Sequence, residues 1–371
     1  MISELLHDPA ASQKLVVKLT GTVCNIDCTY CFEKAKQIDF DRYMQAEVLE
    51  ESLARIDKPI ELLFHGGEPL LLGRERFAAM LGVVRRNRER VKSVAVQTNG
   101  TLLDGQWVDL LFREYADLGI EISISLDGTS AMNRLRVTYG GHPTYDMVRG
   151  AFDLLHSGGQ SAGLLSVIGR HALTHSDSYV EMLSKIPNLR FVKINPLYDS
   201  DPGTLRPDSI TPSEFTSFLM QVAAAWIKVR GYERYPVEPL LSFIQQVLGT
   251  GSKFCHFNQR KCLNFATLYP DGGMGICDNF SRQEFPIMVD DTRGFRQSLN
   301  VLSSSPAMQP FADMMERCSV CEIRELCQGG CLSQRLYFHR NVPSLYEDYC
   351  RHRKEMFAFV KGLLGGGEMN A

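Results

Sequence analysis

Residues 24–31 of the chain read Cys24-Asn25-Ile26-Asp27-Cys28-Thr29-Tyr30-Cys31 and bring three cysteines together in one short segment. Thiolates hold iron–sulfur clusters, and a fully ligated four-iron cluster takes four of them. A group of three cysteines therefore leaves one iron without a protein ligand and free to bind another molecule. This open position indicates an enzyme rather than a purely structural metalloprotein.

The remaining cysteines complete a division of three plus four plus four. The sequence has 11 cysteines, and those outside the first segment are Cys255, Cys262, Cys277, Cys318, Cys321, Cys327, Cys331 and Cys350. Residues 1–12 lack a charged stretch followed by an apolar one, so we expect no secretory signal. Many cysteines in a chain without an export signal favour metal binding over disulfides.

The composition is that of an ordinary packed protein. Hydrophobic residues make up 44% and charged residues 22% of the 371 residues, a length that allows two or more domains. A formal net charge of −3 points to neither nucleic acid nor an anionic membrane. No apolar run reaches the ~18 residues of a transmembrane helix. We therefore expect a cytoplasmic protein with neither nucleic acid nor a membrane as partner.

Strand-like and helix-like segments alternate through the first two thirds of the chain. Short apolar runs predict buried strands at Lys14–Leu19, Ile60–Phe64, Ser93–Thr98, Glu121–Leu126, Ala162–Ile168 and Leu189–Ile194. Helical periodicity predicts helices at Ala46–Ile56, Arg74–Arg86, Gln106–Tyr115, Tyr145–Leu155, Ser178–Lys185 and Ser213–Val229. Such alternation implies parallel strands with crossover helices. Six units are two short of a full barrel, so the expected fold class is α/β with an open, partial (β/α)6 TIM-like barrel.

Polar or glycine-rich stretches follow the first four strands, at the end where such folds bind ligands. They are the cysteine segment, His65-Gly66-Gly67-Glu68-Pro69, Gln97-Thr98-Asn99-Gly100 and Ser125-Leu126-Asp127-Gly128. Each alone could be an ordinary turn, because Asn-Gly and Asp-Gly are common turn dipeptides. Together behind the cysteines they predict a binding site, where paired glycines allow a ligand to approach and Glu68 accepts hydrogen bonds from it.

The cysteine segment, with Tyr30 just before its last cysteine, resembles the signature of the radical S-adenosylmethionine enzymes. Gly66-Gly67-Glu68-Pro69 resembles that family's loop for the methionyl amino group, and the two later loops resemble stretches of its peptide-modifying branch. That branch often has a His-Asp-x-x-Arg segment, of which Met132–Arg136 keeps only the arginine. A guanidinium suits the cofactor carboxylate. The resemblance implies cofactor contacts from Tyr30, His65, Gly66, Gly67, Glu68, Pro69, Gln97, Asn99, Ser125, Asp127 and Arg136.

This resemblance also implies a mechanism. The open iron would bind the amino and carboxylate groups of S-adenosylmethionine, and one electron would cleave it to a 5′-deoxyadenosyl radical. That radical would take a hydrogen atom from an unactivated carbon, while the protein positions the substrate and excludes water and oxygen. Half a zinc site is the competing interpretation of the three cysteines, but the spacing and the four loops disfavour it.

The C-terminal third resembles the SPASM cysteine pattern, with Cys318-x2-Cys321-x5-Cys327-x3-Cys331 and then Cys350. The resemblance implies a first auxiliary cluster on Cys255, Cys262, Cys277 and Cys331, and a second on Cys318, Cys321, Cys327 and Cys350. Spacing alone cannot pair ligands so far apart, and two zinc sites are the alternative. The expected cofactors are thus S-adenosylmethionine and three 4Fe–4S clusters. The expected domains are a barrel at 1–225, a helical linker at 226–254 and a SPASM domain at 255–371.

Asp278 directly follows Cys277 and is the candidate catalytic base. The chain resembles the anaerobic sulfatase-maturing enzymes in length and cysteine spacing, and in those enzymes an Asp at this place removes a proton as the substrate radical is oxidised. A turn or capping aspartate is the alternative interpretation.

The substrate is expected to be a precursor peptide or protein, with an electron donor such as flavodoxin or ferredoxin. Only about a dozen residues precede the first strand, so we expect no N-terminal peptide-recognition domain. The main hypothesis is a maturase that cross-links side chains of a ribosomally made peptide, as cyclophane-forming enzymes do. The alternative is formylglycine formation from Cys or Ser in a sulfatase. A pure iron–sulfur electron carrier is disfavoured, because a carrier has no need of an open iron.

Overall fold

The structure is a computed structural model that describes residues 12–36, 43–258, 262–290 and 292–365. These residues form two compact units that alternate along the chain. The first unit consists of the chain up to Ser125, Arg134–Ala162 and Cys262–Gln309. The second unit consists of Leu126–Asn133, Gly163–Lys261 and the chain from Pro310 onward. Each unit is described by itself.

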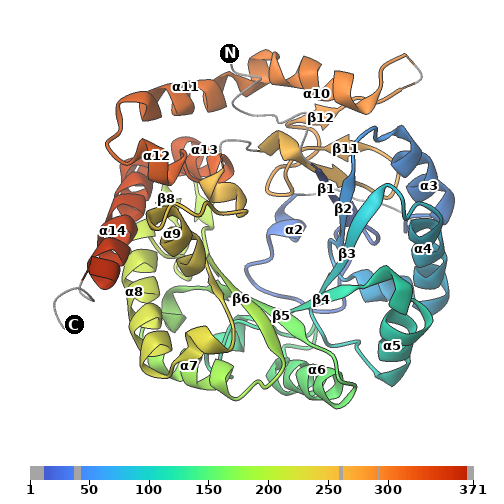
Figure 1. Cartoon of the computed structure of the whole chain (residues 1–371), viewed down its shortest axis with the longest axis horizontal. Helices are drawn as coiled ribbons and strands as arrows, with labels where there is room; N and C mark the ends of the chain where they lie inside the picture. Colours follow the sequence, from blue (N-terminus) through green and yellow to red (C-terminus); the bar gives the residue numbers. More distant parts are fainter. Residues whose placement is uncertain (1–11, 37–42, 259–261, 291, 366–371) are drawn as a thin grey trace. The chain divides into compact units, whose positions relative to one another are not determined.

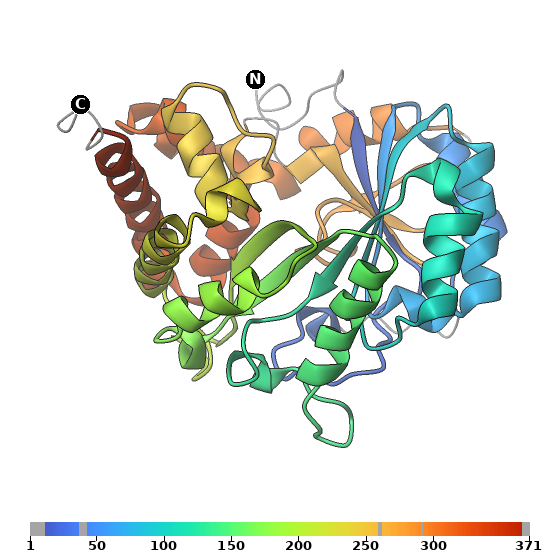
Figure 2. The ribbon, with the colours of Figure 1, turned by 60° about the horizontal axis from the view of Figure 1, so that its bottom comes forward.

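Parallel strands form the centre of the first unit. They are β1 (Gln13–Lys18), β2 (Ile60–His65), β3 (Val91–Thr98) and β4 (Glu121–Ser125), paired in that order. The helices of this part are α2 (Phe32–Ala35), α3 (Ala46–Arg55), α4 (Arg74–Arg86), α5 (Gly105–Asp109) and α6 (Tyr145–Ser157). Helices α3 and α4 lie side by side along the outer face of these strands (Figure 1 and Figure 2).

The C-terminal third of the chain adds strands to the other edge of β1. Strand β10 (Phe265–Leu268) runs parallel to β1, with Val17 opposite Leu268. Strands β11 (Met274–Gly275) and β12 (Pro286–Ile287) continue the sheet in antiparallel fashion, and α10 (Phe295–Ser303) follows. The sequence pattern did not predict these three strands, because each has only two to four residues.

The second unit contains β5 (Ala162–Ile168), β6 (Leu189–Pro196) and the short β9 (Val237–Glu238), in that order in the sheet. A small hairpin joins β7 (Ser200–Asp201) and β8 (Thr204–Leu205). Its helices are α7 (Ser176–Ser184), α8 (Pro212–Lys228), α9 (Leu240–Val247), α11 (Gln309–Arg317), α12 (Arg324–Cys327), α13 (Leu332–Asn341) and α14 (Tyr346–Gly365). Thr211 and Glu214 form a reciprocal capping box at the start of α8, which fixes where this helix begins.

The elements confirm the predicted α/β class. All six predicted strands are present, and the predicted helix at 106–115 is α5 followed by a π-helix at Leu110–Glu114. The range predicted as a helical linker, 226–254, contains both β9 and α9. Each compact unit consists of several separate stretches of the chain. The predicted domains at 1–225, 226–254 and 255–371 are each one continuous stretch. This division into three domains stays a prediction.

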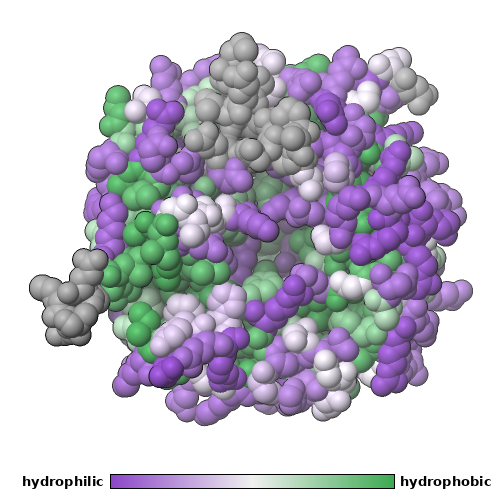
Figure 3. All heavy atoms as spheres, in the orientation of Figure 1, coloured by the Kyte–Doolittle hydropathy of each residue, from purple (hydrophilic) through white to green (hydrophobic). Residues whose placement is uncertain are grey.

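Apolar side chains from the strands form the core of the first unit. Leu15, Val17, Leu62, Phe64 and Val96 are almost fully buried. No helix of the described residues is long and apolar enough to cross a membrane. Hydrophilic side chains are spread over the face shown in Figure 3.

Candidate functional site

The three-cysteine segment lies directly after β1 and ends where α2 begins. Cys31 is the N-cap residue of α2, and its backbone N–H donates to the Cys28 carbonyl oxygen. Two more backbone bonds join the segment to residues 135–137: Asp27 N donates to Val137 O at 2.6 Å and Thr29 N to Leu135 O at 3.0 Å. The three cysteines are partly exposed, and every cysteine in the chain is free of disulfides.

The paired glycines bring the loop after β2 against the backbone that precedes the cysteines. Gly67 N donates to Gly21 O and Glu68 N to Val23 O, both at 2.9 Å. A Cβ on Gly67 would lie 1.8 Å from Val23 O, and Gly66 has a φ of +118°, which favours glycine. Close packing of two protein backbones therefore requires these glycines, in addition to the approach of a ligand that the sequence predicted.

Glu68 joins the loops that follow β2 and β3. Its fully buried carboxylate accepts hydrogen bonds from Leu70 N (3.0 Å), Thr98 Oγ1 (2.7 Å) and Asn99 N (2.7 Å). Burial raises the pKa of Glu68 to about 6, although these three donors act in the opposite direction. Protein groups thus occupy the carboxylate oxygens that we expected to accept hydrogen bonds from a ligand, and the predicted cofactor contact of Glu68 stays a prediction.

Asn99 connects the loop after β3 to the cysteine segment. Its side-chain amide donates to Asn25 Oδ1 at 2.9 Å and to Cys24 Sγ at 3.5 Å. Thr101 in turn donates to Asn99 Oδ1 from both its backbone N–H and its hydroxyl, and accepts from Asn25. The predicted site residue Asn99 therefore orients the first cysteine.

The other predicted cofactor residues occupy different positions. The buried Arg136 donates from Nη1 to Tyr30 Oη at 2.8 Å, so these two predicted residues are brought together. Pro69 is the first residue of the 3-10 helix Pro69–Leu72. Gln97 lies within β3, and Ser125 is the last residue of β4. Asp127 belongs to the second unit, where its Oδ1 accepts from Val167 N at 3.0 Å.

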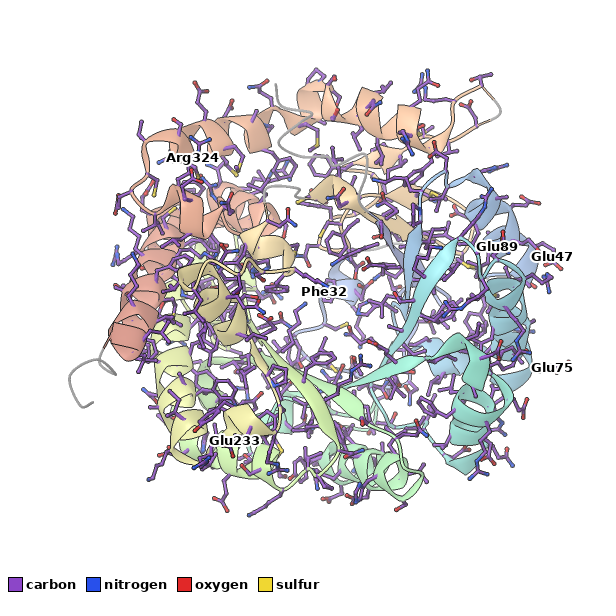
Figure 4. All side chains as sticks on the ribbon, in the orientation of Figure 1. Phe32, Glu47, Glu75, Glu89, Glu233 and Arg324 are labelled. Atoms are coloured by element: carbon purple, nitrogen blue, oxygen red, sulfur yellow. The ribbon has the colours of Figure 1, made fainter. Side chains whose placement is uncertain are left out.

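A cluster of charged side chains lies beside the cysteine segment. Lys18, at the end of β1, places Nζ 2.5 Å from Glu33 Oε1, 2.5 Å from Asp278 Oδ1 and 3.4 Å from His65 Nδ1. Lys36 contacts the same two carboxylates, at 3.0 Å and 3.2 Å, and its Nζ lies 4.4 Å from the ring centre of Phe32, which Figure 4 labels. We name Lys18, Glu33, Lys36, His65 and Asp278 the charged cluster.

Asp278 is ionised in this environment. Burial alone raises a carboxyl pKa, but the charges of Lys18 and Lys36 and the hydrogen bond with His65 outweigh it and hold the pKa of Asp278 well below its usual range. His65 Nδ1 lies 3.3 Å from Asp278 Oδ2. The predicted base is thus present as a carboxylate, and its catalytic role stays a prediction.

The ligand atoms of Glu33, His65 and Asp278 lie within 4.8 Å of one another, a spacing that could suit a metal ion. The ammonium group of Lys18 already lies between them and has three N–H donors for these three acceptors. The lysine therefore takes the place of a cation. No local pattern singled out Lys18, because Lys14 lies on the same strand and the acceptors of Lys18 come from other segments of the chain.

The second unit holds one predicted cysteine set by itself. Cys318, Cys321, Cys327 and Cys350 line one open cavity, together with Arg335 and Arg353. The donor set of four thiols fits a four-thiolate cluster. Of the other predicted set, Cys262 and Cys277 belong to the first unit and Cys255 and Cys331 to the second, so their grouping stays a prediction.

The profile of the Radical SAM superfamily matches residues 19–183. The matched range contains the three-cysteine segment, the Gly-Gly-Glu-Pro loop and Arg136. The chain carries a radical SAM domain. Within this range the three thiols are partly exposed, and the Asn99 amide orients Cys24. This donor set fits an iron–sulfur cluster held by three cysteines.

Known relatives extend the similarity beyond this radical SAM domain. The chain is 25% identical to the cysteine-type anaerobic sulfatase-maturating enzyme of Clostridium novyi (strain NT), over 93% of this chain and 94% of that protein. It is 24% identical to the enzyme of the same description from Clostridium perfringens (strain 13 / Type A), over 93% and 95% of the two chains.

Solved structures are similar to the whole fold. Native anSMEcpe with bound AdoMet gives a TM-score of 0.79 at 23% identity, covering 96% of this chain and 100% of that one. Streptococcus suis SuiB bound to precursor peptide SuiA gives a TM-score of 0.59 at 15% identity. The match covers 88% of this chain and 73% of the SuiB chain. These similarities confirm the predicted partial barrel followed by a cysteine-rich region.

Proposed function

We propose that this radical SAM enzyme oxidises a cysteine or serine side chain of a protein substrate to formylglycine. The observation that carries the proposal is the end-to-end match to the sulfatase-maturating enzyme of Clostridium novyi, over 93% of this chain and 94% of that one. The two enzymes from Clostridium novyi and Clostridium perfringens that match this chain end to end are both of the cysteine type, which favours cysteine as the oxidised residue.

The chain has residues suited to hold the cofactor. Cys24, Cys28 and Cys31 would hold a 4Fe–4S cluster, and Arg136 would pair with the carboxylate of S-adenosylmethionine. When bound, these groups supply a 5′-deoxyadenosyl radical that removes a hydrogen atom from the substrate. Glu68 and Asn99 keep the surrounding loops in place, through the bonds that join the loops after β2 and β3 to each other and to Cys24.

The oxidation requires two further transfers and, for a cysteine substrate, an exchange with water. After the hydrogen atom leaves Cβ, one electron and one proton must also leave to form a carbon–sulfur or carbon–oxygen double bond. When the substrate is cysteine, water then hydrolyses the carbon–sulfur double bond. The products are the aldehyde of formylglycine and hydrogen sulfide. We assign the proton to Asp278, which is ionised and therefore able to accept it.

The electron would pass to auxiliary clusters. Eight cysteines outside the radical SAM segment suffice for two fully ligated clusters, and four of them share one cavity in the second unit. Fully ligated clusters have no open iron and are suited to electron transfer. An external donor such as flavodoxin or ferredoxin would reduce the radical SAM cluster before each turnover.

The mass of the product tests this proposal. Anaerobic reaction with a peptide that carries the Cys-containing segment of a sulfatase should exchange sulfur for oxygen with the net loss of two hydrogens, and the product should react with a hydrazide. A Cys28→Ala variant is the matched control and should leave the peptide unchanged. A peptide that loses only two hydrogens, keeps its sulfur and gives no hydrazide adduct would rule out formylglycine.

Cross-linking of a ribosomally made precursor peptide is the second candidate. The similarity to the SuiB fold favours it, because that solved structure contains a precursor peptide. A short peptide encoded beside this gene should then lose two hydrogens per modification, and the link should survive reduction and alkylation.

A further inference from the structure

Two buried arginines contact the cysteines of the second unit's cavity. Arg335 from α13 donates from Nη1 to Cys318 Sγ at 3.3 Å, and Arg353 from α14 donates from Nε to Cys327 Sγ at 3.4 Å. Each residue is only 2% exposed. N–H groups of two different helices are therefore directed at two of the four thiol sulfurs.

Protein groups fix both guanidinium groups in place. Arg335 also donates to Gly329 O, Met314 O and Tyr346 Oη, at 3.2, 2.9 and 2.9 Å. The Arg353 guanidinium lies 4.0 Å from the ring centre of Phe257 and 4.7 Å from that of Phe243. Side chains held in this way cannot turn away from the sulfurs without losing several contacts.

Within the described part of the chain, neither positive charge has a carboxylate partner. Among the described residues, no ion pair joins Arg335 or Arg353 to Asp or Glu, and Arg335 Nε is buried without a hydrogen-bond partner. A buried charge is costly unless an opposite charge pairs with it. A four-iron cluster with four thiolates is a dianion when oxidised and gains a further negative charge when reduced. The cavity thus has the counter-charge that such a cluster needs.

We infer that Arg335 and Arg353 are positioning residues for the second auxiliary cluster, and that their charges and N–H···S bonds raise its reduction potential. This inference rests on the proposed cluster assignment but not on the identity of the substrate. Hydrogen bonds to cluster sulfurs and nearby charge set the potentials of iron–sulfur centres, because both stabilise the more negative reduced form. A raised potential would favour this cluster as an acceptor of the electron that the substrate radical releases.

Arg335→Met and Arg353→Met test the inference in the fully reconstituted enzyme without substrate. Redox titration followed by electron paramagnetic resonance should show one of the reduction steps shifted to lower potential in each variant, with the other steps unchanged. Arg324→Met is the matched control. Arg324, labelled in Figure 4, lines the same cavity but is exposed, so solvent screens its charge and its removal should shift that step far less.

Three results would overturn the inference. Met variants that keep their iron and the parent potential would show that the arginines do not tune the cluster. A shift no larger than that of Arg324→Met would show a non-specific charge effect. If the Met variants lose iron, Arg335→Lys and Arg353→Lys decide: iron retained at a lowered potential supports the inference, whereas iron lost or a parent potential gives the arginines a purely structural role.

A failed peptide assay would leave this measurement intact, because the titration needs no substrate. A parent protein without iron at Cys318, Cys321, Cys327 and Cys350 would overturn both the cluster assignment and the inference. The two proposals can therefore fail separately.

Discussion

Asp278, to which we assign the role of proton acceptor, is also a member of several ion pairs. Its carboxylate contacts Lys18, Lys36 and His65, and these partners keep it charged. A carboxylate so stabilised is a weak base until one of its cationic partners moves or the proton donor becomes strongly acidic. Oxidation of a substrate radical creates such an acidic donor, because the adjoining proton is lost from a cation-like species.

Asp278→Asn should separate cofactor cleavage from product formation. The amide keeps the shape of the side chain but cannot accept the proton, so we expect product to form ~10²–10⁴-fold more slowly. Release of 5′-deoxyadenosine and the iron content should remain at the parent level. Quantifying 5′-deoxyadenosine and product in the same reaction measures the two yields.

Asp153→Asn, an exposed position on α6, is the matched control and should behave as the parent. Unchanged product formation in Asp278→Asn would place the base elsewhere, and loss of iron would mean that the aspartate supports the loop of Cys277.

Gly67→Ala should disturb the cysteine segment. The new Cβ would lie 1.8 Å from Val23 O, so the backbone that leads into Cys24 must move. We expect the variant to lose the iron of the radical SAM cluster while it keeps the rest. Iron analysis of the purified variant measures this loss. Gly105→Ala is the matched control, because its new Cβ would meet open space. Full iron content in Gly67→Ala would contradict the proposed packing role.

The sequence predicted site residues that lie on one loop more readily than contacts between loops. Three cysteines within eight positions, or two adjacent glycines, are visible in a local pattern. The charged cluster was not, because it joins Lys18 and Glu33 to Asp278 across more than half of the chain. The bond from Arg335 to Cys318 was hidden for the same reason, since helix periodicity alone does not identify which buried arginine faces a thiol.

The loops after β2 and β3 depend on one buried carboxyl group for their connection. Burial raises the pKa of Glu68 from 4.5 to about 6, so the folded protein holds this proton more tightly than the unfolded chain. Its stabilising contribution is therefore complete below pH 4.5 and is lost as the pH rises through 6. At about 1.36 kcal/mol per pH unit, the loss reaches ~2 kcal/mol by pH 7.

Glu68→Gln should remove this pH dependence, because an amide does not titrate in this range. Urea unfolding of the parent and the variant at pH 5 and pH 7 gives the two free-energy differences. The parent should lose more stability than the variant over this interval. Equal losses in both proteins would mean that Glu68 has the same pKa in the folded and unfolded states.

Elements with a strong local pattern were predicted within a few residues, and short or irregular ones were not. The predicted strand at 162–168 and the predicted helix at 74–86 have the observed bounds of β5 and α4. Strand β10 escaped prediction because its four residues are specified by pairing with β1, a partner far away in the sequence. The π-helix at 110–114 has the same side-chain pattern as an α-helix over so short a stretch.

The whole molecule should bind ~12 irons and as many sulfides if all three cysteine sets hold four-iron clusters. Replacing Cys24, Cys28 and Cys31 together by Ala should remove one third of the iron, because the other sets do not use these residues. Metal analysis of anaerobically reconstituted protein measures both values. Tightly bound zinc at the remaining cysteines of freshly isolated protein would contradict the iron–sulfur assignment.

The pairing of β1 with β10 has a consequence for biosynthesis. Strand β1 leaves the ribosome long before Phe265–Leu268, the strand that completes its second edge. Until then, one edge of β1 keeps its N–H and C=O groups open to pairing with another nascent chain. A protein that stops at residue 225 should therefore self-associate, whereas the full chain should not, and light scattering of the two can compare them. A cell that makes this enzyme therefore needs to keep the unfinished sheet apart from other nascent chains until Phe265–Leu268 has been made.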